Sequence, residues 1–245
     1  MSEPRPLFTR PGYCGICERE TTFAAWGEWL RDHYLCDGCG TLPRHRALVE
    51  VLKIVKPGWR ALEIHESAPS LPFLAKLCPA YTTSFLLEGV PPGQVVGGRR
   101  CEDLERLTFA DETFDVFITQ DVLEHVFDPA RALHEIVRVL RWGGVHVFTA
   151  PKHKELLKSQ ARARRVAGSV QHLLPAQYHG SPVGDGGSLV TWDYGADFDD
   201  LVKIWAGFNV SAYVIRDGAR GLVGEYLDVF VISKDVANRV KRSVS

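Results

Sequence analysis

The sequence lacks the features that would assign it to a membrane, a secreted or a nucleic-acid-binding class of protein. Its apolar runs stay well short of the roughly 20 residues that a helix needs to cross a bilayer. The N-terminus, MSEPRPLFTRPGYCG, has proline and charge where a secretory signal has an apolar region. Lysine and arginine total 29 and aspartate and glutamate total 30, so the net charge of -1 gives no overall attraction to anionic partners. We therefore expect a cytoplasmic protein with no membrane or nucleic-acid partner.

The composition is that of an ordinary globular protein. Of the 245 residues, 45% are hydrophobic, 10% are aromatic and 24% are charged. These fractions exclude a disordered chain, a collagen-like repeat and a small scaffold held by disulfides. The length fits one α/β domain with a small appendage, and it supplies ample material for a buried core.

Four of the six cysteines form two closely spaced pairs near the N-terminus. The pairs read Cys14-Gly-Ile-Cys17 and Cys36-Asp-Gly-Cys39. Each Cys-x-x-Cys turn points two sulfurs at one ion, and four thiolates suit tetrahedral zinc with no open coordination position. We predict a structural zinc site with Cys14, Cys17, Cys36 and Cys39 as ligands, in a zinc-ribbon-like module over residues 1–43. The alternative is four thiols without a ligand.

The remainder of the chain alternates between strand-like and helix-like segments. A linking helix is predicted over residues 44–58, followed by one domain over 59–245. Strands are predicted at 60–64, 114–119 and 145–149, helices at 71–77, 129–140 and 198–206, and two further β-prone runs at 208–215 and 226–232. Alternating strands and helices are typical of a parallel sheet covered on both faces. The predicted fold class is therefore α/β: a Rossmann-like, doubly wound, mostly parallel sheet with a C-terminal antiparallel hairpin.

Several short motifs occur in order in the middle of the chain. They are Cys101 to Phe109, Phe114-Asp-Val, Gln120 to His125, Glu135 to Leu140 and Gly143-Gly144. In these motifs the chain resembles class I S-adenosylmethionine-dependent methyltransferases, specifically the group that acts on small molecules. The resemblance covers residues 59–150 well and is looser up to residue 234. It implies S-adenosylmethionine as the cofactor.

The resemblance also implies cofactor contacts at the carboxyl ends of the strands. Asp103 matches the family's carboxylate that accepts a hydrogen bond from the adenine amino group, and Leu104 supplies a backbone amide and an apolar wall. Gln120 and Asp121 follow the strand predicted at 114–119, and the resemblance implies that they line the methionine end of the cofactor pocket. In an open parallel sheet, ligands bind at this edge because the loops leave backbone amides free.

The first loop departs from the family pattern. The family has an acidic residue and then a loop of alternating glycines, which lets the backbone approach the cofactor. Here Glu63 keeps the acidic place, while His65, Ser67 and Pro69 take the glycine places. We expect Glu63, His65, Glu66 and Ser67 to contact the cofactor, because carboxylates bind its amine and histidine and serine can donate to its carboxylate.

Candidate catalytic residues lie beyond these strands, in and next to an insertion over residues 151–190 that is expected to cover the active site. A base is required only if the acceptor must lose a proton, and histidine is suited to that task near neutral pH. The candidates are His125, His153, Tyr178 and His179, with packing as the alternative role for His125. The insertion also holds six basic residues between Lys152 and Arg165. We interpret this stretch as a solvated helix face; the alternative is a lid for an anionic or carrier-bound acceptor.

The sequence favours a methyltransferase that acts on a small molecule, with a biosynthetic role, over two alternatives. In one, the altered glycine loop presents another carbon of the sulfonium, which would give aminocarboxypropyl transfer or cyclisation of the cofactor side chain. In the other, the chain is a methyltransferase-like module without catalytic activity that binds nucleic acid or protein. The near-neutral charge and the Asp103 motif argue against the binding module.

Overall fold

The computed structural model describes residues 5–180 and 187–240. The chain divides into two compact units. Unit 1 contains the chain up to Trp59 together with Ala212–Val229, and unit 2 contains Arg60–Ser211 together with the segment from Phe230 onward. Residues 1–4 of the predicted module, 181–186 of the insertion and 241–245 of the predicted domain lie outside the described residues. No helix in the described ranges is long and apolar enough to cross a membrane.

Unit 1 is built on a three-stranded antiparallel sheet in the order β1-β2-β3. Its elements are β1 (Phe8–Cys14), β2 (Arg19–Ala25), α1 (Leu30–His33), β3 (Tyr34–Cys36), α2 (Pro43–Val55) and η3 (Gly218–Arg220). Arg46 of α2 is 1% exposed, and its guanidinium lies 4.6 Å from the centre of the Phe23 ring. That guanidinium also donates to the carbonyl oxygens of Tyr34 and Gly221. The helix predicted as a linker is thus part of this unit.

Unit 2 contains most of a six-stranded sheet. The strands lie in the order β16-β17-β9-β8-β4-β5, and β17 runs antiparallel to β9 while β9, β8, β4 and β5 are mutually parallel. Their bounds are β4 (Ile64–Ser67), β5 (Tyr81–Ser84), β8 (Phe114–Gln120), β9 (Leu140–Thr149), β16 (Val210–Tyr213) and β17 (Val229–Ser233). The predicted Rossmann-like α/β class with two adjacent C-terminal strands is confirmed.

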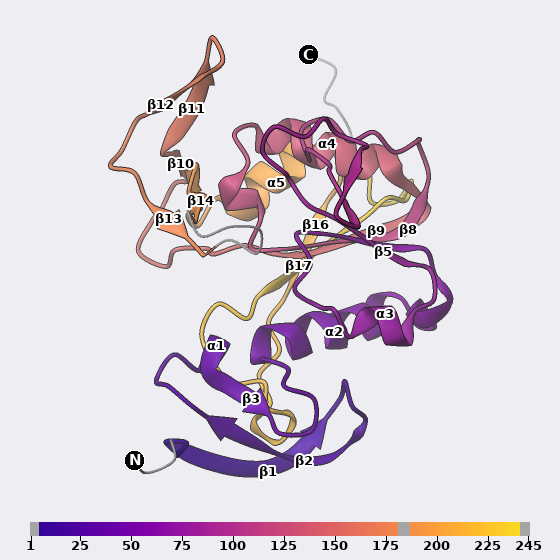
Figure 1. Ribbon diagram of the computed structural model, residues 1–245, viewed down its shortest axis with the longest axis vertical. Helices are drawn as coiled ribbons and strands as arrows, with labels where there is room; N and C mark the ends of the chain where they lie inside the picture. The colour runs from indigo at the N-terminus through magenta and orange to yellow at the C-terminus, as the bar shows by residue number, and fades with distance from the viewer. Residues whose placement is uncertain (1–4, 181–186, 241–245) are drawn as a thin grey trace. The chain divides into compact units, whose positions relative to one another are not determined.

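Helices cover the sheet of unit 2, as Figure 1 shows for α4 (Pro129–Val139) and α5 (Phe198–Ala206), which lie together on one face. Asp128 caps α4 by accepting a hydrogen bond from the Arg131 amide at 3.0 Å. Apolar side chains of both helices pack on Phe148 and Phe230 of the sheet. The remaining short elements are η1 (Trp59–Ala61), α3 (Leu74–Leu77), β6 (Val95–Val96), β7 (Arg99–Arg100) and η2 (Leu123–His125).

The first strand of unit 2 differs from its prediction. Trp59–Ala61 forms a 3-10 turn, and β4 begins only at Ile64 and continues to Ser67. All four strand residues are buried because β5 and β8 flank the strand on both sides. The later start changes which side chains reach the carboxyl edge of the sheet.

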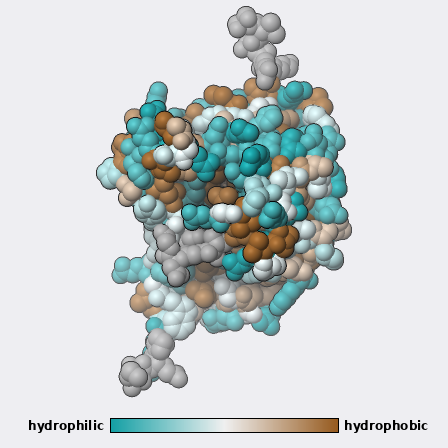
Figure 2. All heavy atoms as spheres, turned by 45° about the horizontal axis from the view of Figure 1, so that its top comes forward, coloured by the Kyte–Doolittle hydropathy of each residue, from teal (hydrophilic) through white to brown (hydrophobic). Residues whose placement is uncertain are grey.

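The insertion contains strands rather than the predicted helix face. These are β10 (Gln160–Ala161), β11 (Ala163–Val166), β12 (Ser169–His172), β13 (Tyr178–His179) and β14 (Ser188–Leu189), followed by β15 (Trp192–Asp193). Ala167 and Gly168, both at positive φ, form a two-residue turn that joins β11 to β12 in a hairpin. Of the six basic residues of the stretch, Arg164 and Arg165 lie in this hairpin. The hairpin projects outward in Figure 1. Figure 2 shows apolar side chains in small groups among hydrophilic ones on the face in view.

Candidate functional site

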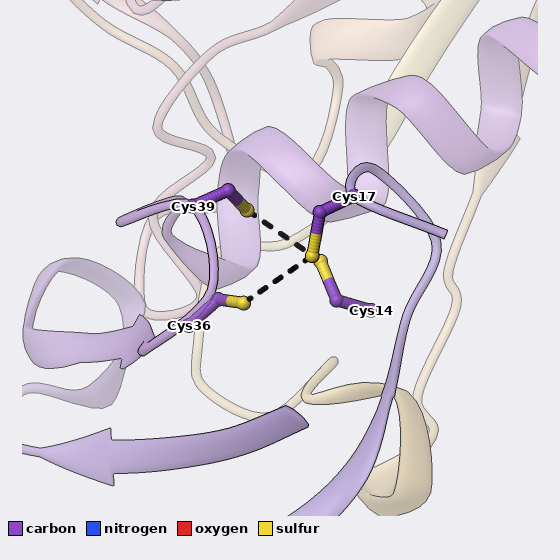
Figure 3. Close-up of side chains that lie close together, drawn as sticks. All are labelled: Cys14, Cys17, Cys36 and Cys39. Atoms are coloured by element: carbon purple, nitrogen blue, oxygen red, sulfur yellow. Dashed lines mark hydrogen bonds between the residues drawn. The ribbon is translucent and has the colours of Figure 1, made fainter. Parts of the chain in front are cut away.

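The four cysteines of unit 1 lie at the ends of two strands and in the turns that follow them (Figure 3). The Sγ atoms of Cys14 and Cys39 are 3.7 Å apart, and those of Cys17 and Cys36 are 3.8 Å apart. All four sulfurs lie within 4.8 Å of one another. With zinc–sulfur bonds of about 2.3 Å, the edge of a tetrahedron is about 3.8 Å. The sulfur positions therefore match a closed tetrahedral site.

The charges around the cysteines also suit a cation. The hydrogen bond from the Cys39 thiol lowers the pKa of Cys14 to about 4, whereas burial raises the pKa of Cys17. Four thiolates and one divalent ion would carry a net charge of -2. Burial lowers the pKa of the Arg46 guanidinium, and the charges of Cys14, Cys36 and Cys39 raise it again. Arg46 is thus a buried cation that offsets the thiolate charge.

A second cluster lies at the carboxyl ends of β4 and β8 in unit 2. The carboxylate of Glu66 is buried and accepts hydrogen bonds from the Ser70 amide at 2.9 Å and from the Tyr81 hydroxyl at 2.5 Å. The side-chain amide of Gln120 donates to Ser70 Oγ at 2.6 Å. The Oε1 atom of Gln120 is buried with no hydrogen-bond partner among the described residues. This edge therefore presents a buried acceptor that a ligand's donor could satisfy.

The backbone next to this cluster is strained at two positions. Ala68, after β4, has φ 50°, and Asp121, after β8, has φ 51°. Residues other than glycine take this left-handed conformation at a cost of about 1 kcal/mol or more, and such strain is concentrated at functional sites. Ala68 thus adopts a backbone conformation that glycine takes more readily. Asp121 is fixed there by a hydrogen bond from Thr149 Oγ1 at 2.9 Å.

The predictions for Glu63 and His65 are wrong. Glu63 is exposed just before β4, at the amino end of the strand, because the strand starts later than predicted. His65 is fully buried, and its ring nitrogens bond to Thr82 and Ser84 of β5 at 2.9 Å each. Burial lowers the pKa of His65 to about 3, so the neutral ring belongs to the core. Ser67 is buried at the end of β4, and Glu66 is the acidic residue that reaches the carboxyl edge.

Burial of Glu66 predicts a measurable dependence of stability on pH. Burial raises its pKa from 4.5 to about 7, so between these values the folded protein holds a proton that the unfolded chain has released. The free energy of unfolding should therefore fall as pH rises through this window, by up to about 3 kcal/mol. Denaturant unfolding of the wild type and Glu66→Gln at pH 5 and pH 8 measures the effect. The stability of the variant relative to the wild type should rise with pH; a pH-independent difference would contradict the prediction.

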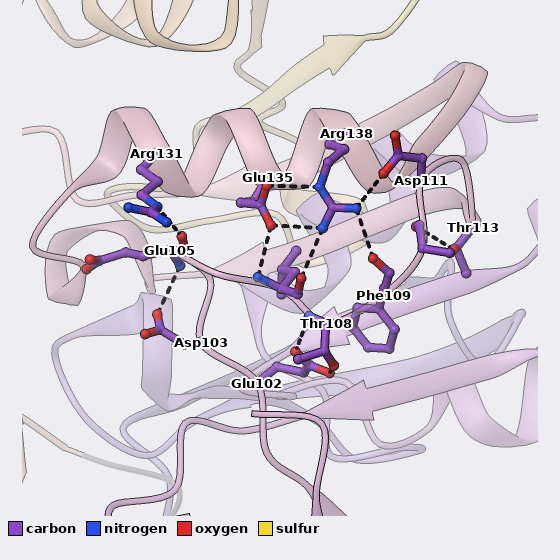
Figure 4. A network of polar contacts seen from close by, with 12 residues as sticks. Glu102, Asp103, Glu105, Thr108, Phe109, Asp111, Thr113, Arg131, Glu135 and Arg138 are labelled. Atoms are coloured by element: carbon purple, nitrogen blue, oxygen red, sulfur yellow. Dashed lines mark hydrogen bonds and ion pairs between the residues drawn. The ribbon is translucent and has the colours of Figure 1, made fainter. Parts of the chain in front are cut away.

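Asp103 and Leu104 lie on the loop that follows β7 (Figure 4). Asp103 Oδ1 accepts a hydrogen bond from the Glu105 amide at 2.9 Å, and Leu104 is 6% exposed and packs with Leu107 and Phe114. Arg138 of α4 holds the same loop, because its guanidinium donates to the carbonyl oxygens of Leu107 and Phe109 at 3.0 and 2.9 Å. This role of Arg138 was not predicted from the sequence. The spacing of Glu135 and Arg138 on one helix face is the signal that could have indicated an ion pair.

The structure brings the three candidate histidines together. The rings of His125 and His179 are 5.3 Å apart, and His125 Nδ1 lies 2.9 Å from the Leu189 carbonyl oxygen. Burial lowers the pKa of His179; the charge of Asp121 raises this pKa and that of His153 lowers it. His153 Nε2 lies 3.9 Å from Asp193 Oδ1. Tyr178, the fourth candidate, is 57% exposed.

Neither Asp193 nor Glu124 of this region was predicted, although both are buried acids next to candidate histidines. Asp193 also receives hydrogen bonds from Gln160 and Arg162 of the insertion, at 3.1 and 2.7 Å. Since Asp121 acts on the pKa of both His125 and His179, the histidine cluster adjoins the carboxyl end of β8. The predicted cofactor edge and the predicted acceptor side are therefore neighbours.

Comparisons with known proteins agree with this architecture. Residues 87–148 match a family model described as a methyltransferase domain. A curated relative, the ubiquinone biosynthesis O-methyltransferase of Parvibaculum lavamentivorans, is 40% identical over 80 residues. The match covers 33% of this chain and 31% of the relative, so the chain spans about a third of the length of that relative.

Solved structures show the fold over a larger part of the chain. The sugar N-methyltransferase KedS8 from Streptoalloteichus superimposes with a TM-score of 0.51 and 15% identity over 84% of this chain and 90% of that one. The amino pentose methyltransferase CalS10 from Micromonospora echinaspora gives a TM-score of 0.50 and 15% identity over 80% of this chain and 93% of that one. The chain thus has the Rossmann-like fold of S-adenosylmethionine-dependent methyltransferases, and its residues 87–148 match the methyltransferase domain family.

Proposed function

We propose that this protein is an S-adenosylmethionine-dependent methyltransferase that acts on a small molecule in a biosynthetic pathway. The observation that carries the proposal is the carboxyl edge of the sheet, where Glu66, Gln120 and Asp121 lie close together. The motifs that contain these residues follow one another in the same order as in the family. The match of residues 87–148 to the methyltransferase domain supports it. By their names, the curated relative is an O-methyltransferase of ubiquinone biosynthesis and the similar structure KedS8 is a sugar N-methyltransferase, which favours a small acceptor.

The residues at this edge fit the cofactor. Gln120 Oε1, a buried acceptor with no partner among the described residues, suits the α-ammonium group of its methionine part. Asp103, whose carboxylate is oriented by the Glu105 amide, suits the adenine amino group. When bound, the cofactor supplies a methyl group from its sulfonium: the acceptor's lone pair forms the new bond to carbon, and the electrons of the broken carbon–sulfur bond stay on sulfur.

The chain's own contribution is alignment of the acceptor and removal of its proton. Because the sulfonium is already activated, orientation of the acceptor accounts for much of the acceleration. His125, His153 and His179 lie beside the cofactor edge, and a neutral imidazole among them takes the proton that an oxygen or nitrogen acceptor loses. Burial lowers the pKa of both His125 and His179, which keeps them in the neutral form that a base requires.

In unit 1 we propose that the four cysteines hold a structural zinc ion. The sulfur separations of 3.7 and 3.8 Å and the buried Arg46 support this role. Four thiolates complete a tetrahedral shell, so the ion has no position left for a substrate. Its contribution is to folding of the module, not to the reaction.

Calorimetric titration with S-adenosylhomocysteine tests the proposed function. Asp103→Asn should weaken binding by about 10- to 100-fold, because a charge-assisted hydrogen bond contributes about 1.5–3 kcal/mol. Asp111→Asn is the matched control, since Asp111 is a more exposed acid on the same loop and pairs with Arg138. It should leave the affinity within about 3-fold of the wild type. Absence of binding by the wild-type protein would contradict the proposal.

A second chemistry with the same cofactor is favoured by one observation, the loop Ser67-Ala68-Pro69-Ser70 in place of glycines. A shifted sulfonium would present another carbon to the acceptor. Product masses separate the two: methyl transfer yields S-adenosylhomocysteine and an acceptor heavier by one methyl group. Aminocarboxypropyl transfer or side-chain cyclisation yields methylthioadenosine instead.

A further inference from the structure

We propose that Glu124, His125 and His179 of unit 2 bind a divalent transition-metal cation, at a site separate from the four cysteines. One ligand atom from each of these side chains lies within 4.8 Å of the other two. Two imidazoles and one carboxylate form a ligand set that suits zinc, iron, cobalt or manganese and leaves coordination positions open. Binding of the cation does not depend on the proposed function; only the role of the cation toward the acceptor rests on that function.

The hydrogen bond of His125 determines which ring nitrogen faces the site. Its Nδ1 lies 2.9 Å from the carbonyl oxygen of Leu189, which can only accept, so Nδ1 carries the hydrogen. In the neutral ring the lone pair is then on Nε2. Metal-binding histidines usually make this same bond from the other ring nitrogen to a carbonyl or carboxylate. His125 is therefore already oriented as a ligand through Nε2.

The Nε2 lone pair of His125 faces the carboxylate of Glu124. The distance from Nε2 to Glu124 Oε1 is 3.9 Å, which is too long for a hydrogen bond. Two ligands of one tetrahedral ion with bonds of about 2.1 Å are about 3.4 Å apart. A shift of a few tenths of an ångström would bring both atoms to one cation, which would also neutralise a buried carboxylate.

His179 is brought to the same place by the β13–β14 pairing (Figure 1). In this pairing Tyr178 is opposite Leu189, the residue whose carbonyl orients His125. Two residues further on, Thr191 donates from its amide and its hydroxyl to the Glu124 carbonyl oxygen at 2.7 and 3.0 Å. Residues 188–191, at and just beyond the end of the insertion, therefore position all three ligands. Such backbone and side-chain hydrogen bonds to the ligand residues fix the geometry of a metal site.

The site has a defined use next to the cofactor edge. Glu124 and His125 lie in η2, which is separated by two residues from the carboxyl end of β8, so the cation would lie beside the methionine end of the pocket. A bound divalent ion lowers the pKa of a coordinated oxygen acid, as it lowers that of water to about 7 on zinc. We infer an acceptor with a hydroxyl or phenol oxygen that coordinates the ion as its alkoxide or phenolate. Its proton passes to His153, the candidate histidine that is not a ligand, because His125 and His179 then hold the cation.

Titration of cobalt(II) into protein whose cysteine site is already filled with zinc tests the proposal. Calorimetry should detect one further binding event per chain, with the weak visible bands of nitrogen and oxygen ligands and without thiolate charge transfer. His179→Ala and His125→Ala should each lower the affinity by more than the roughly 10- to 100-fold that is lost when a residue hydrogen-bonded to a metal ligand is removed. His172→Ala is the matched control, because His172 is an exposed histidine of the same insertion, on β12.

The outcomes are distinct from those of the methyltransferase test, because cobalt binding requires no cofactor and no acceptor. His179 is on a short surface strand, so His179→Ala should fold even if changes at the buried Glu124 do not. Equal cobalt affinity in the wild type and His179→Ala would overturn the proposal. So would the absence of any event beyond the cysteine site, even if S-adenosylhomocysteine binds normally.

Discussion

Cys36→Ser is expected to abolish zinc binding at the cysteine site and to unfold the three-stranded sheet of unit 1. Structural zinc contributes about 10–16 kcal/mol of apparent binding free energy, which is comparable with the whole stability of a small domain. Serine keeps the size of the side chain but replaces the thiolate ligand, so the effect isolates coordination from packing. Metal analysis should show the loss of one zinc ion per chain. Hydrogen exchange should show fast amides over β1, β2 and β3.

Cys101→Ser is the control for this experiment. Cys101 is also fully buried, and its thiol donates to the Val90 carbonyl oxygen at 3.2 Å, but it lies in unit 2 outside the cysteine cluster. The control should keep its zinc and its slow amide exchange in unit 1. If Cys36→Ser also retained both, zinc coordination by these cysteines would be refuted.

Arg138→Met is expected to destabilise unit 2 by about 2–4 kcal/mol and to loosen the loop that carries Asp103. The guanidinium donates to the carbonyl oxygens of Leu107 and Phe109 and pairs with Glu135 and Asp111 (Figure 4). Each lost bond to a charged donor costs about 1 kcal/mol or more, and the freed carbonyls lose their partner. Denaturant unfolding measures the loss. Affinity for S-adenosylhomocysteine should fall as well, because Asp103 would no longer be held in one place.

Arg141→Met provides the comparison for Arg138→Met. Arg141 also pairs with an acid, Asp115, at 3.0 Å, but its side chain is 41% exposed and the pair is near the start of β9. Exposed ion pairs contribute about 0–1 kcal/mol, so this variant should be nearly as stable as the wild type. Equal losses of unfolding free energy in the two variants would show that the bonds of Arg138 to the loop carbonyls contribute no more to stability than an exposed ion pair.

The parts of the fold that could be predicted from sequence are those with a strong local pattern. The helix over 198–206 and the strand from Phe114 were predicted nearly to the residue, because apolar periodicity and flanking turn residues mark them. The β4 boundary was missed, since Leu62, Glu63 and Ile64 alternate like a strand although Trp59–Ala61 turns just before them. Because of that shift, Glu66 and not Glu63 is the acidic residue near the carboxyl end of the strand.

Long-range pairing explains what the sequence could not show about the site. The grouping of His125 with His179 depends on β13 and β14, which are only two residues long and have no periodicity to detect. The bond from Arg138 to the Leu107 carbonyl joins positions 31 residues apart. The three histidines were chosen as candidate bases because each follows a strand or lies in the insertion expected to cover the active site, and their proximity to one another was not predicted. Their catalytic role and the zinc ligands stay predictions.

The origin of the two sides of the site has a consequence for how acceptor preference could diverge. Glu66, Gln120 and Asp121 come from the ends of sheet strands, whereas His179 and the carbonyl that orients His125 come from the insertion. Under the proposed function, substitutions within residues 151–190 would change which molecule is modified and would leave the contacts of the strand ends with the methionine part of the cofactor unchanged. Exchange of that segment between homologous enzymes is a direct route to engineered selectivity.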